Sequence, residues 1–347
     1  MIVAVLAGTL VWCSSARVRA NERLSSLSEF DGAASAAPAD GLWTLPPSPR
    51  FDLILSETQS TWVAREGQVG AAPPVEAPRE HAVITSPRFR VPAEPWCWQI
   101  LPNGLIYRSY LAGAKEPRFA SAWAHERELG WIWDVALGGR VGLLRYGTQD
   151  SLWPEGWQLD IEGAALPRLV QDNGWILMAS DFRFGIPLTY GCGRFRTKFG
   201  YYHLSSHLGD EYMLLQPSVR RLNYARDAIL WGNSFYWTND LRLYAEAAWA
   251  FSIDDGAEPW EFQFGIDYSP DRPGKASGTP FLAVNTHLRQ EVAFGGNLVV
   301  QTGWQWRGGD SGQLFRMGMQ YFAGMSEQFE FYDAYEEKLG LAVWYDF

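Results

Sequence analysis

Several kinds of residue on which common protein classes depend are scarce in this chain. Its 347 residues include only three cysteines, which are too few for a disulfide scaffold or a multi-cysteine zinc site. It has 29 basic residues against 39 acidic ones, a formal net charge of −10. That balance argues against a nucleic-acid-binding protein, which needs a basic face to engage phosphates.

Long apolar runs are also missing. No internal stretch reaches the roughly 18 apolar residues of a membrane-spanning helix. Aromatic residues, in contrast, make up 15% of the chain, with 18 tryptophans, and there are 34 glycines. This composition is too apolar for a wholly disordered chain. Abundant aromatic residues and glycines without long apolar runs favour a β-rich protein.

The N-terminus is typical of an export signal. Residues 2–12 are apolar, and the polar stretch after them ends in Val18-Arg19-Ala20, which has a small residue at the cleavage position. We expect residues 1–20 to be a signal peptide, although no basic residue precedes the apolar run. A lipoprotein site at Cys13 is less favoured, because Trp12 is bulky. Outside the cytoplasm, Cys97 and Cys192 could pair or remain thiols.

The rest of the chain divides in two. Residues 21–95 are rich in Ala, Pro, Ser and Glu, and the repeated prolines interrupt any periodic element. This composition predicts a mostly extended periplasmic linker. From residue 96 to residue 347 the pattern changes to short alternating segments separated by turns.

The alternation is the central signal in residues 96–347. In the segment 260–268, for example, aromatic and aliphatic residues at even positions alternate with polar residues and glycine at odd positions. Twelve such segments can be drawn: 104–112, 133–146, 156–166, 176–188, 193–208, 226–238, 240–252, 260–269, 280–292, 295–307, 311–323 and 337–347.

These segments favour a membrane barrel over a soluble β-sandwich. Many have the ~9–11 residues that a tilted strand needs to cross a bilayer. Aromatic residues gather near the segment ends, as in interfacial girdles, and the polar face carries full charges such as Arg140, Asp160 and Arg289. We therefore predict an all-β fold: an antiparallel transmembrane β-barrel of about twelve strands in the outer membrane, with an extended N-terminal segment and a largely plugged lumen.

The C-terminal segment fits this prediction. Residues 337–347 alternate and end in Phe347, a pattern that resembles the signal read by the barrel-assembly machinery of bacteria. With both termini in the periplasm, 208–224 and 324–336 become long external loops, and 191–193, 238–240 and 307–311 become short periplasmic turns. Residues 270–280 are long for a periplasmic turn.

One group of residues indicates chemistry. In segment 193–208 the outward series continues into His203 and Ser205, which strand periodicity places side by side on the lipid-facing wall. His203 could act as a general base that makes Ser205 a nucleophile. A third group would have to orient His203. Asn233 on the next strand is one candidate, and the loop residues Asp210 and Glu211 are alternatives.

This group resembles the active sites of outer-membrane phospholipase A and the lipid A deacylase barrels. Tyr201-Tyr202-His203-Leu204-Ser205 matches their Tyr-x-His-x-Ser motif on the outer wall, and the phospholipase adds an Asn from the adjacent strand. The match ends there, because those families continue with Asn and often Gly where this chain has Ser206 and His207. The resemblance suggests calcium dependence by analogy, but the sequence offers no clear ligand set and identifies no cofactor.

A longer resemblance covers most of the chain. Residues 101–113, 156–163 and 202–211 are similar to those of an uncharacterised bacterial family, domain of unknown function 1207. It implies a secreted, barrel-like protein without an established activity.

Two functional hypotheses follow. In the first, the protein is an acyl hydrolase that acts on outer-membrane lipids, namely outer-leaflet phospholipid or lipid A, with Ser205 as nucleophile and His203 as base. In the second, it is a non-enzymatic barrel: a narrow channel, an adhesin or a structural protein. An interfacial pair of histidines near the headgroups, hydrogen-bonded to Ser205 and to lipid, fits the second. Asp160 and Glu162 could imitate a glycosidase pair, although salt-linked packing is the simpler interpretation.

Overall fold

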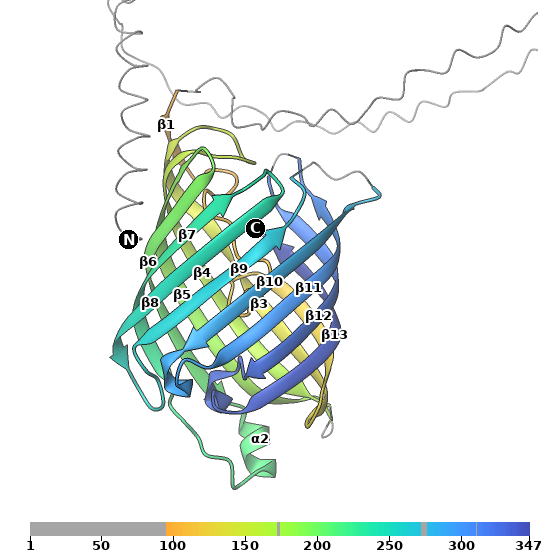
Figure 1. Ribbon diagram of the computed structural model, residues 1–347. Helices are drawn as coiled ribbons and strands as arrows, with labels where there is room; N and C mark the ends of the chain where they lie inside the picture. The colour runs from red at the N-terminus through yellow and green to blue at the C-terminus, as the bar shows by residue number, and fades with distance from the viewer. Residues whose placement is uncertain (1–94, 172–173, 272–275, 310) are drawn as a thin grey trace, which may run out of the picture. The chain divides into compact units, whose positions relative to one another are not determined.

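The computed structural model describes residues 95–171, 174–271, 276–309 and 311–347, and these form a closed antiparallel β-barrel (Figure 1). Twelve strands of the described residues make its wall: β2 (Phe119–Glu126), β3 (Gly130–Gly147), β4 (Gly156–Val170), β5 (Ile176–Cys192), β6 (Phe195–Leu208), β7 (Ala225–Tyr236), β8 (Leu241–Ile253), β9 (Trp260–Tyr268), β10 (Thr279–Arg289), β11 (Gly296–Arg307), β12 (Leu314–Met325) and β13 (Tyr335–Asp346). Each strand pairs with the next, and β13 closes the wall by pairing with β2.

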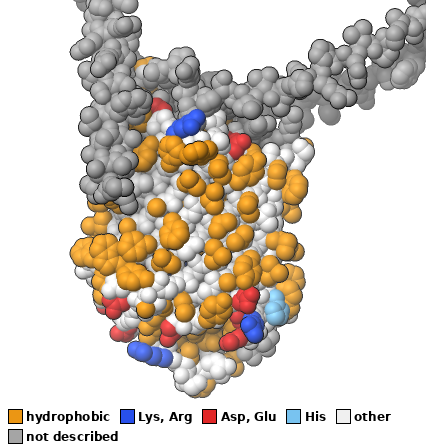
Figure 2. All heavy atoms as spheres, viewed as in Figure 1, with side chains coloured by type: hydrophobic (Ala, Val, Ile, Leu, Met, Phe, Trp, Pro, Cys, Tyr) orange, Lys and Arg blue, Asp and Glu red, His pale blue; other side chains and the backbone are white. Residues whose placement is uncertain are grey.

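The polarity of the wall is that of a membrane barrel. Outward side chains are apolar and exposed, as at Trp260 (42%), Phe264 (43%) and Val343 (41%), whereas Arg140 and Arg316 face inward and are buried. Figure 2 shows the hydrophobic side chains spread over the wall, with charged groups gathered near its rims. The predicted alternation and twelve-stranded membrane barrel are confirmed.

One predicted strand is wrong, and the structure replaces it with another. Segment 104–112 lies inside the lumen, and the strand that completes the wall is β2, which lies outside all twelve predicted segments. In β2 the inward residues are Ala120, Ala122 and Ala124, so the hydrophobic alternation is weak. A short additional strand, β1 (Cys97–Ile100), pairs with the same edge of β3 beyond the end of β2.

The chain between β1 and β2, residues 101–118, fills the barrel; we call it the plug. It has no regular backbone ladder, so its carbonyl groups need other donors. Arginines supply them: Arg145 donates to the carbonyls of residues 103 and 104, Arg242 to those of 108 and 109, and Arg316 to that of 111. Three wall strands therefore hold the plug by its backbone.

The plug's side chains also join the wall. Tyr110 stacks on Tyr244 of β8 with ring centroids 4.0 Å apart, and its hydroxyl donates to Glu246 at 2.9 Å. Glu246 in turn pairs with Lys198 of β6 at 2.7 Å. Tyr107 and Tyr110 are fully buried. The lumen is thus occupied by packed side chains, in agreement with the expected plugged barrel.

One rim of the barrel carries the longest connection, residues 209–224; we call it the loop end. It holds residues 209–224, which include helix α2 (Asp210–Leu215), and residues 326–334, which include the 3₁₀ turn η4 (Phe329–Phe331). The second connection folds into the lumen, because Phe329 is buried there. No helix of the described residues is long and apolar enough to cross a membrane.

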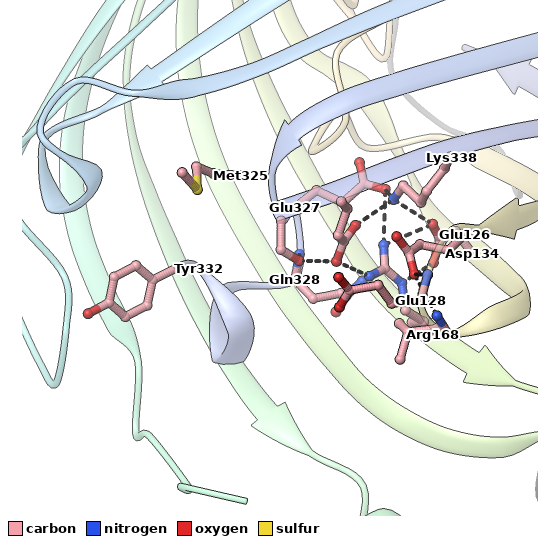
Figure 3. A network of polar contacts seen from close by, with 12 residues as sticks. Glu126, Glu128, Asp134, Arg168, Met325, Glu327, Gln328, Tyr332 and Lys338 are labelled. Carbon is pink, nitrogen blue, oxygen red and sulfur yellow. Dashed lines mark hydrogen bonds and ion pairs between the residues drawn. The ribbon is translucent and has the colours of Figure 1, made fainter. Parts of the chain in front are cut away.

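A cluster of buried ions fixes this inward fold. Arg168 of β4 contacts Asp134 at 2.5 Å, Glu336 at 2.5 Å and Glu327 at 3.3 Å, and Lys338 of β13 contacts the same three carboxylates (Figure 3). Breaking such a buried pair would leave an uncompensated charge, which is strongly destabilising. The cluster ties β3, β4, β13 and the 326–334 connection together.

The opposite rim carries Phe347, the short turns 193–194 and 237–240, and the longer connections 148–155 and 269–278. The ring of Phe347 packs on Phe119 with centroids 5.6 Å apart. It also covers Gly139, where an added Cβ would lie 2.7 Å from the ring. Phe347 therefore fills the break in the wall between β1 and β2, where a side chain at residue 139 would displace it.

Several expectations fall on other parts of the chain. The signal peptide, the Cys13 alternative and nearly all of the 21–95 linker lie outside the described residues.

Cys97 carries a free thiol, so it does not pair with Cys192. Asp160 and Glu162 both face Arg140, at 2.6 Å and 3.8 Å, which makes them part of the salt-linked lumen.

The hydrogen bonds from wall arginines to the plug carbonyls give a stability prediction. Arg242→Met removes the donor for two plug carbonyls and the partner of Asp267, 3.5 Å away. We expect it to lower the free energy of unfolding by about 3 kcal/mol. Arg127→Met is the control, because Arg127 is 78% exposed and its pair with Glu337 is 3.9 Å long, so a change below about 0.5 kcal/mol is expected. Urea titration in lipid vesicles measures the free energy of unfolding of both variants. Equal losses in the two would contradict the stabilising role of Arg242.

The filled lumen gives a prediction about transport. Purified protein inserted into a planar bilayer should show no stepwise ion current, because the plug occupies the passage between the two rims. A porin measured in the same bilayer serves as the positive control. Reproducible unitary currents from the unmodified protein would show that the plug leaves a continuous aqueous path.

Candidate active site

The last residues of β6 alternate across the wall near the loop end. Tyr202, Leu204 and Ser206 face inward and are buried, whereas His203, Ser205 and His207 face outward. This is the placement that strand periodicity predicts, because successive side chains of a strand point to opposite faces. The side chain of His203 is 41% exposed, so it is accessible from the membrane side.

A carboxylate on the neighbouring strand orients His203. The register of β6 and β7 places Asp227 directly opposite His203, and His203 Nδ1 lies 2.9 Å from Asp227 Oδ1. A carboxylate oxygen is an acceptor only, so Nδ1 is the nitrogen that carries the proton. In the neutral ring with its proton on Nδ1, the other nitrogen, Nε2, is an acceptor, as a general base requires.

Tyr201 holds Asp227 from the other side. Its hydroxyl donates to Asp227 Oδ1 at 2.6 Å. An unpaired carboxylate on a lipid-facing wall would be costly, and these two donors satisfy it. Tyr201, His203 and Asp227 therefore form one connected group that spans two strands.

The structure separates the other predicted orienting residues from His203. Asn233 lies opposite Thr197, six residues further along β7 than Asp227, a displacement of roughly 20 Å at the usual strand rise. Asp210 is the first residue of α2, beyond the end of β6. Sequence reasoning missed Asp227, although it is the charged member of the outward series 225, 227, 229 and 231. Asp227 lies two residues before Ile229 in the outward series of β7, so extending the alternation from Ile229 toward the N-terminus identifies it.

Ser205 lies beside this group. It faces Ala225 on β7 and Phe182 on β5, and it is two residues from His203 on the same face. Among the described residues, no hydrogen bond engages its hydroxyl. Around it the wall is apolar, with Phe182 45%, Phe184 41% and Phe251 53% exposed. The arrangement brings a hydroxyl and an oriented imidazole to the surface that meets acyl chains.

In the portion of the chain that the structure describes, no group of three or more His, Cys, Asp or Glu side chains could hold a metal ion. Asp227, the carboxylate nearest to the site, already accepts two hydrogen bonds through one oxygen.

The closed twelve-stranded wall, its apolar exterior and its charged lumen define an outer-membrane β-barrel. The chain belongs to the family described as protein of unknown function DUF1207, whose model matches residues 76–347. This confirms the resemblance found in the sequence.

Solved structures similar to this chain include enzymes and porins. Outer membrane phospholipase A from Escherichia coli has a TM-score of 0.47 and 9% identity, over 66% of this chain and 96% of that one. The Salmonella typhi outer membrane phospholipase dimer with bound calcium has a TM-score of 0.47 and 11% identity, over 69% and 91%. A KdgM porin has a TM-score of 0.37 and 12% identity, over 66% and 99%. No curated protein matches the sequence.

Proposed function

We propose that this barrel is a serine acyl hydrolase that cleaves ester-linked acyl chains from outer-membrane lipid, either phospholipid or lipid A of the outer leaflet. The observation that carries the proposal is the contact between His203 Nδ1 and Asp227 Oδ1 on the outer wall, next to Ser205. Nucleophile, base and orienting carboxylate are the three parts of triad chemistry, which is recognised by geometry and roles.

The reaction uses each group once in each half. Ser205 Oγ attacks the ester carbonyl carbon while His203 Nε2 accepts the hydroxyl proton. Asp227 keeps the ring in the required tautomer and stabilises the imidazolium that forms, and Tyr201 holds Asp227 in place. His203 then returns the proton to the leaving alcohol. Water attacks the acyl-enzyme in the second half, and the fatty acid departs.

The position of Ser205 fits such a substrate. It lies three residues before the end of β6, close to the loop end. With both termini in the periplasm, the loop end is external, and this depth corresponds to the outer leaflet. Lipid ester bonds lie between the acyl chains and the headgroups, which is where a strand end meets the membrane interface. The substrate would reach Ser205 by lateral diffusion within the leaflet.

The filled lumen favours an activity on the wall over a channel. Residues 101–118 occupy the passage, and the 326–334 connection folds over the plug at the loop end. The other expected partner, the barrel-assembly machinery, would bind the C-terminal strand β13 and Phe347 during insertion.

The nucleophile is tested by Ser205→Ala. We expect at least a 10³-fold loss of fatty-acid release from phosphatidylethanolamine or lipid A in mixed micelles, because the covalent intermediate can no longer form. Ser121→Ala is the matched control, since Ser121 is an outward serine on β2 that accepts a hydrogen bond from Trp133. If the folded unmodified protein releases no fatty acid from either lipid, the hydrolase proposal is wrong.

The orienting group is tested by comparing two positions on β7. Asp227→Ala should lower kcat by roughly 10²–10⁴-fold, because His203 loses the partner that fixes its tautomer. Asn233→Ala should change kcat less than about twofold, since Asn233 lies opposite Thr197. A large effect at Asn233 with none at Asp227 would reverse the assignment.

A further inference from the structure

The proposed reaction needs a group that the triad does not contain. When Ser205 attacks an ester, negative charge develops on the carbonyl oxygen, and hydrolases stabilise it with hydrogen-bond donors aimed at that atom. Backbone amides next to the nucleophile often supply these donors. Here the nucleophile lies within a strand, where the amides belong to the β-ladder.

The amide that follows the nucleophile is already used. Ser206 N donates to the carbonyl oxygen of Tyr224 at 2.9 Å, which extends the β6–β7 ladder past Ala225. Freeing it would break a ladder bond at the point where β7 begins. The stabilising donor must therefore come from a side chain on the outward face.

The immediate neighbours of Ser205 on that face leave one candidate. The residues directly opposite, Phe182 and Ala225, have no donor. Along β6, two residues away on either side, are His203 and His207. His203 is committed to the base role through Asp227. Ser180, opposite His207 on β5, also carries a hydroxyl, but it is only 7% exposed. His207 is therefore the exposed donor next to Ser205 that is left for this role.

The surroundings of the two histidines differ in the way these roles require. Asp227 anchors the ring of His203. The ring of His207 lies against Phe182, with ring centroids 5.9 Å apart, and no hydrogen bond to either of its nitrogens occurs among the described residues. An imidazole carries at least one N–H in every protonation state. His207 therefore keeps a donor available.

On the basis of the proposed function, we infer that His207 is a further catalytic residue that donates a hydrogen bond to the oxyanion. As the bond from Ser205 Oγ to the carbonyl carbon forms, the carbonyl π electrons move to oxygen and His207 N–H stabilises that charge. When the electrons return, the alcohol leaves with the proton from His203. Ser205 is then flanked by a base on one side and an electrophile on the other, both supplied by the same strand.

Three variants of the full-length protein, assayed in mixed micelles that contain phosphatidylethanolamine, test this role. His207→Leu removes the donor, and we expect kcat to fall about 10²–10³-fold while KM changes less than about threefold. His207→Gln retains an N–H, and we expect it to recover at least tenfold of that loss. His125→Leu is the control, because His125 is exposed on β2 and packs against Trp131. It should retain the unmodified kcat.

The outcomes separate the two proposals. If Ser205→Ala is inactive while His207→Leu keeps the full kcat, the hydrolase stands and the role of His207 is wrong. If His207→Leu raises KM as well as lowering kcat, and His207→Gln is no more active than His207→Leu, His207 has only a structural role. If the unmodified protein is inactive, or Ser205→Ala is as active as the unmodified protein, the proposed function itself fails. Comparison of heated and unheated mobility on gels confirms that each variant folds.

Discussion

Charge inside a narrow barrel must find a partner, and this requirement shapes the rest of the molecule. An arginine that faces a low-dielectric lumen without a partner would cost several kcal/mol. Arg140 meets Asp160, and Arg168 meets three carboxylates. Where carboxylates are lacking, as around Arg145, backbone carbonyl oxygens of the plug take their place. The plug is therefore part of the charge balance of the wall as well as a filling.

The outer wall is subject to the same requirement, but there apolar side chains are the rule and a charged side chain is the exception. Hydrocarbon tolerates apolar side chains there, and a carboxylate is an exception that needs justification. Asp227 is such an exception, and it is satisfied by Tyr201 and His203 rather than by an arginine. A salt bridge to a permanent cation would hold the carboxylate equally well. The choice of an imidazole is what makes this part of the wall chemically distinctive.

Period-two alternation was sufficient to predict the barrel, eleven of its twelve wall strands and the inward or outward direction of most side chains, including His203 and Ser205. The total of twelve agrees because the false strand 104–112 takes the place of β2. This pattern does not identify a strand whose inward side chains are small and apolar, because the two faces then differ little in polarity. In β2 the inward residues are alanines, so the strand looked like a loop. In the plug, Leu105, Tyr107 and Leu111 imitate a strand, although arginines bind its carbonyl groups.

Register is the other quantity that the sequence did not provide. The connection 209–224 contains a helix and an extended stretch, so its length does not tell which residue of β7 faces His203. Asn233 is the polar residue that periodicity predicts on the outward face of the next strand, and the pairing places Asp227 opposite His203 instead. Side-chain direction follows from local geometry, whereas pairing between strands depends on how the chain returns.

The break between β1 and β2 has a consequence for the permanence of the plug. Both ends of the plug continue into strands hydrogen-bonded to β3, one through residues 144–147 and the other through residues 130–137. A plug attached to the wall at only one end could leave the lumen while the barrel stays intact. The plug is joined to wall strands at both ends, so for either end to come away, β1 or β2 would have to separate from β3.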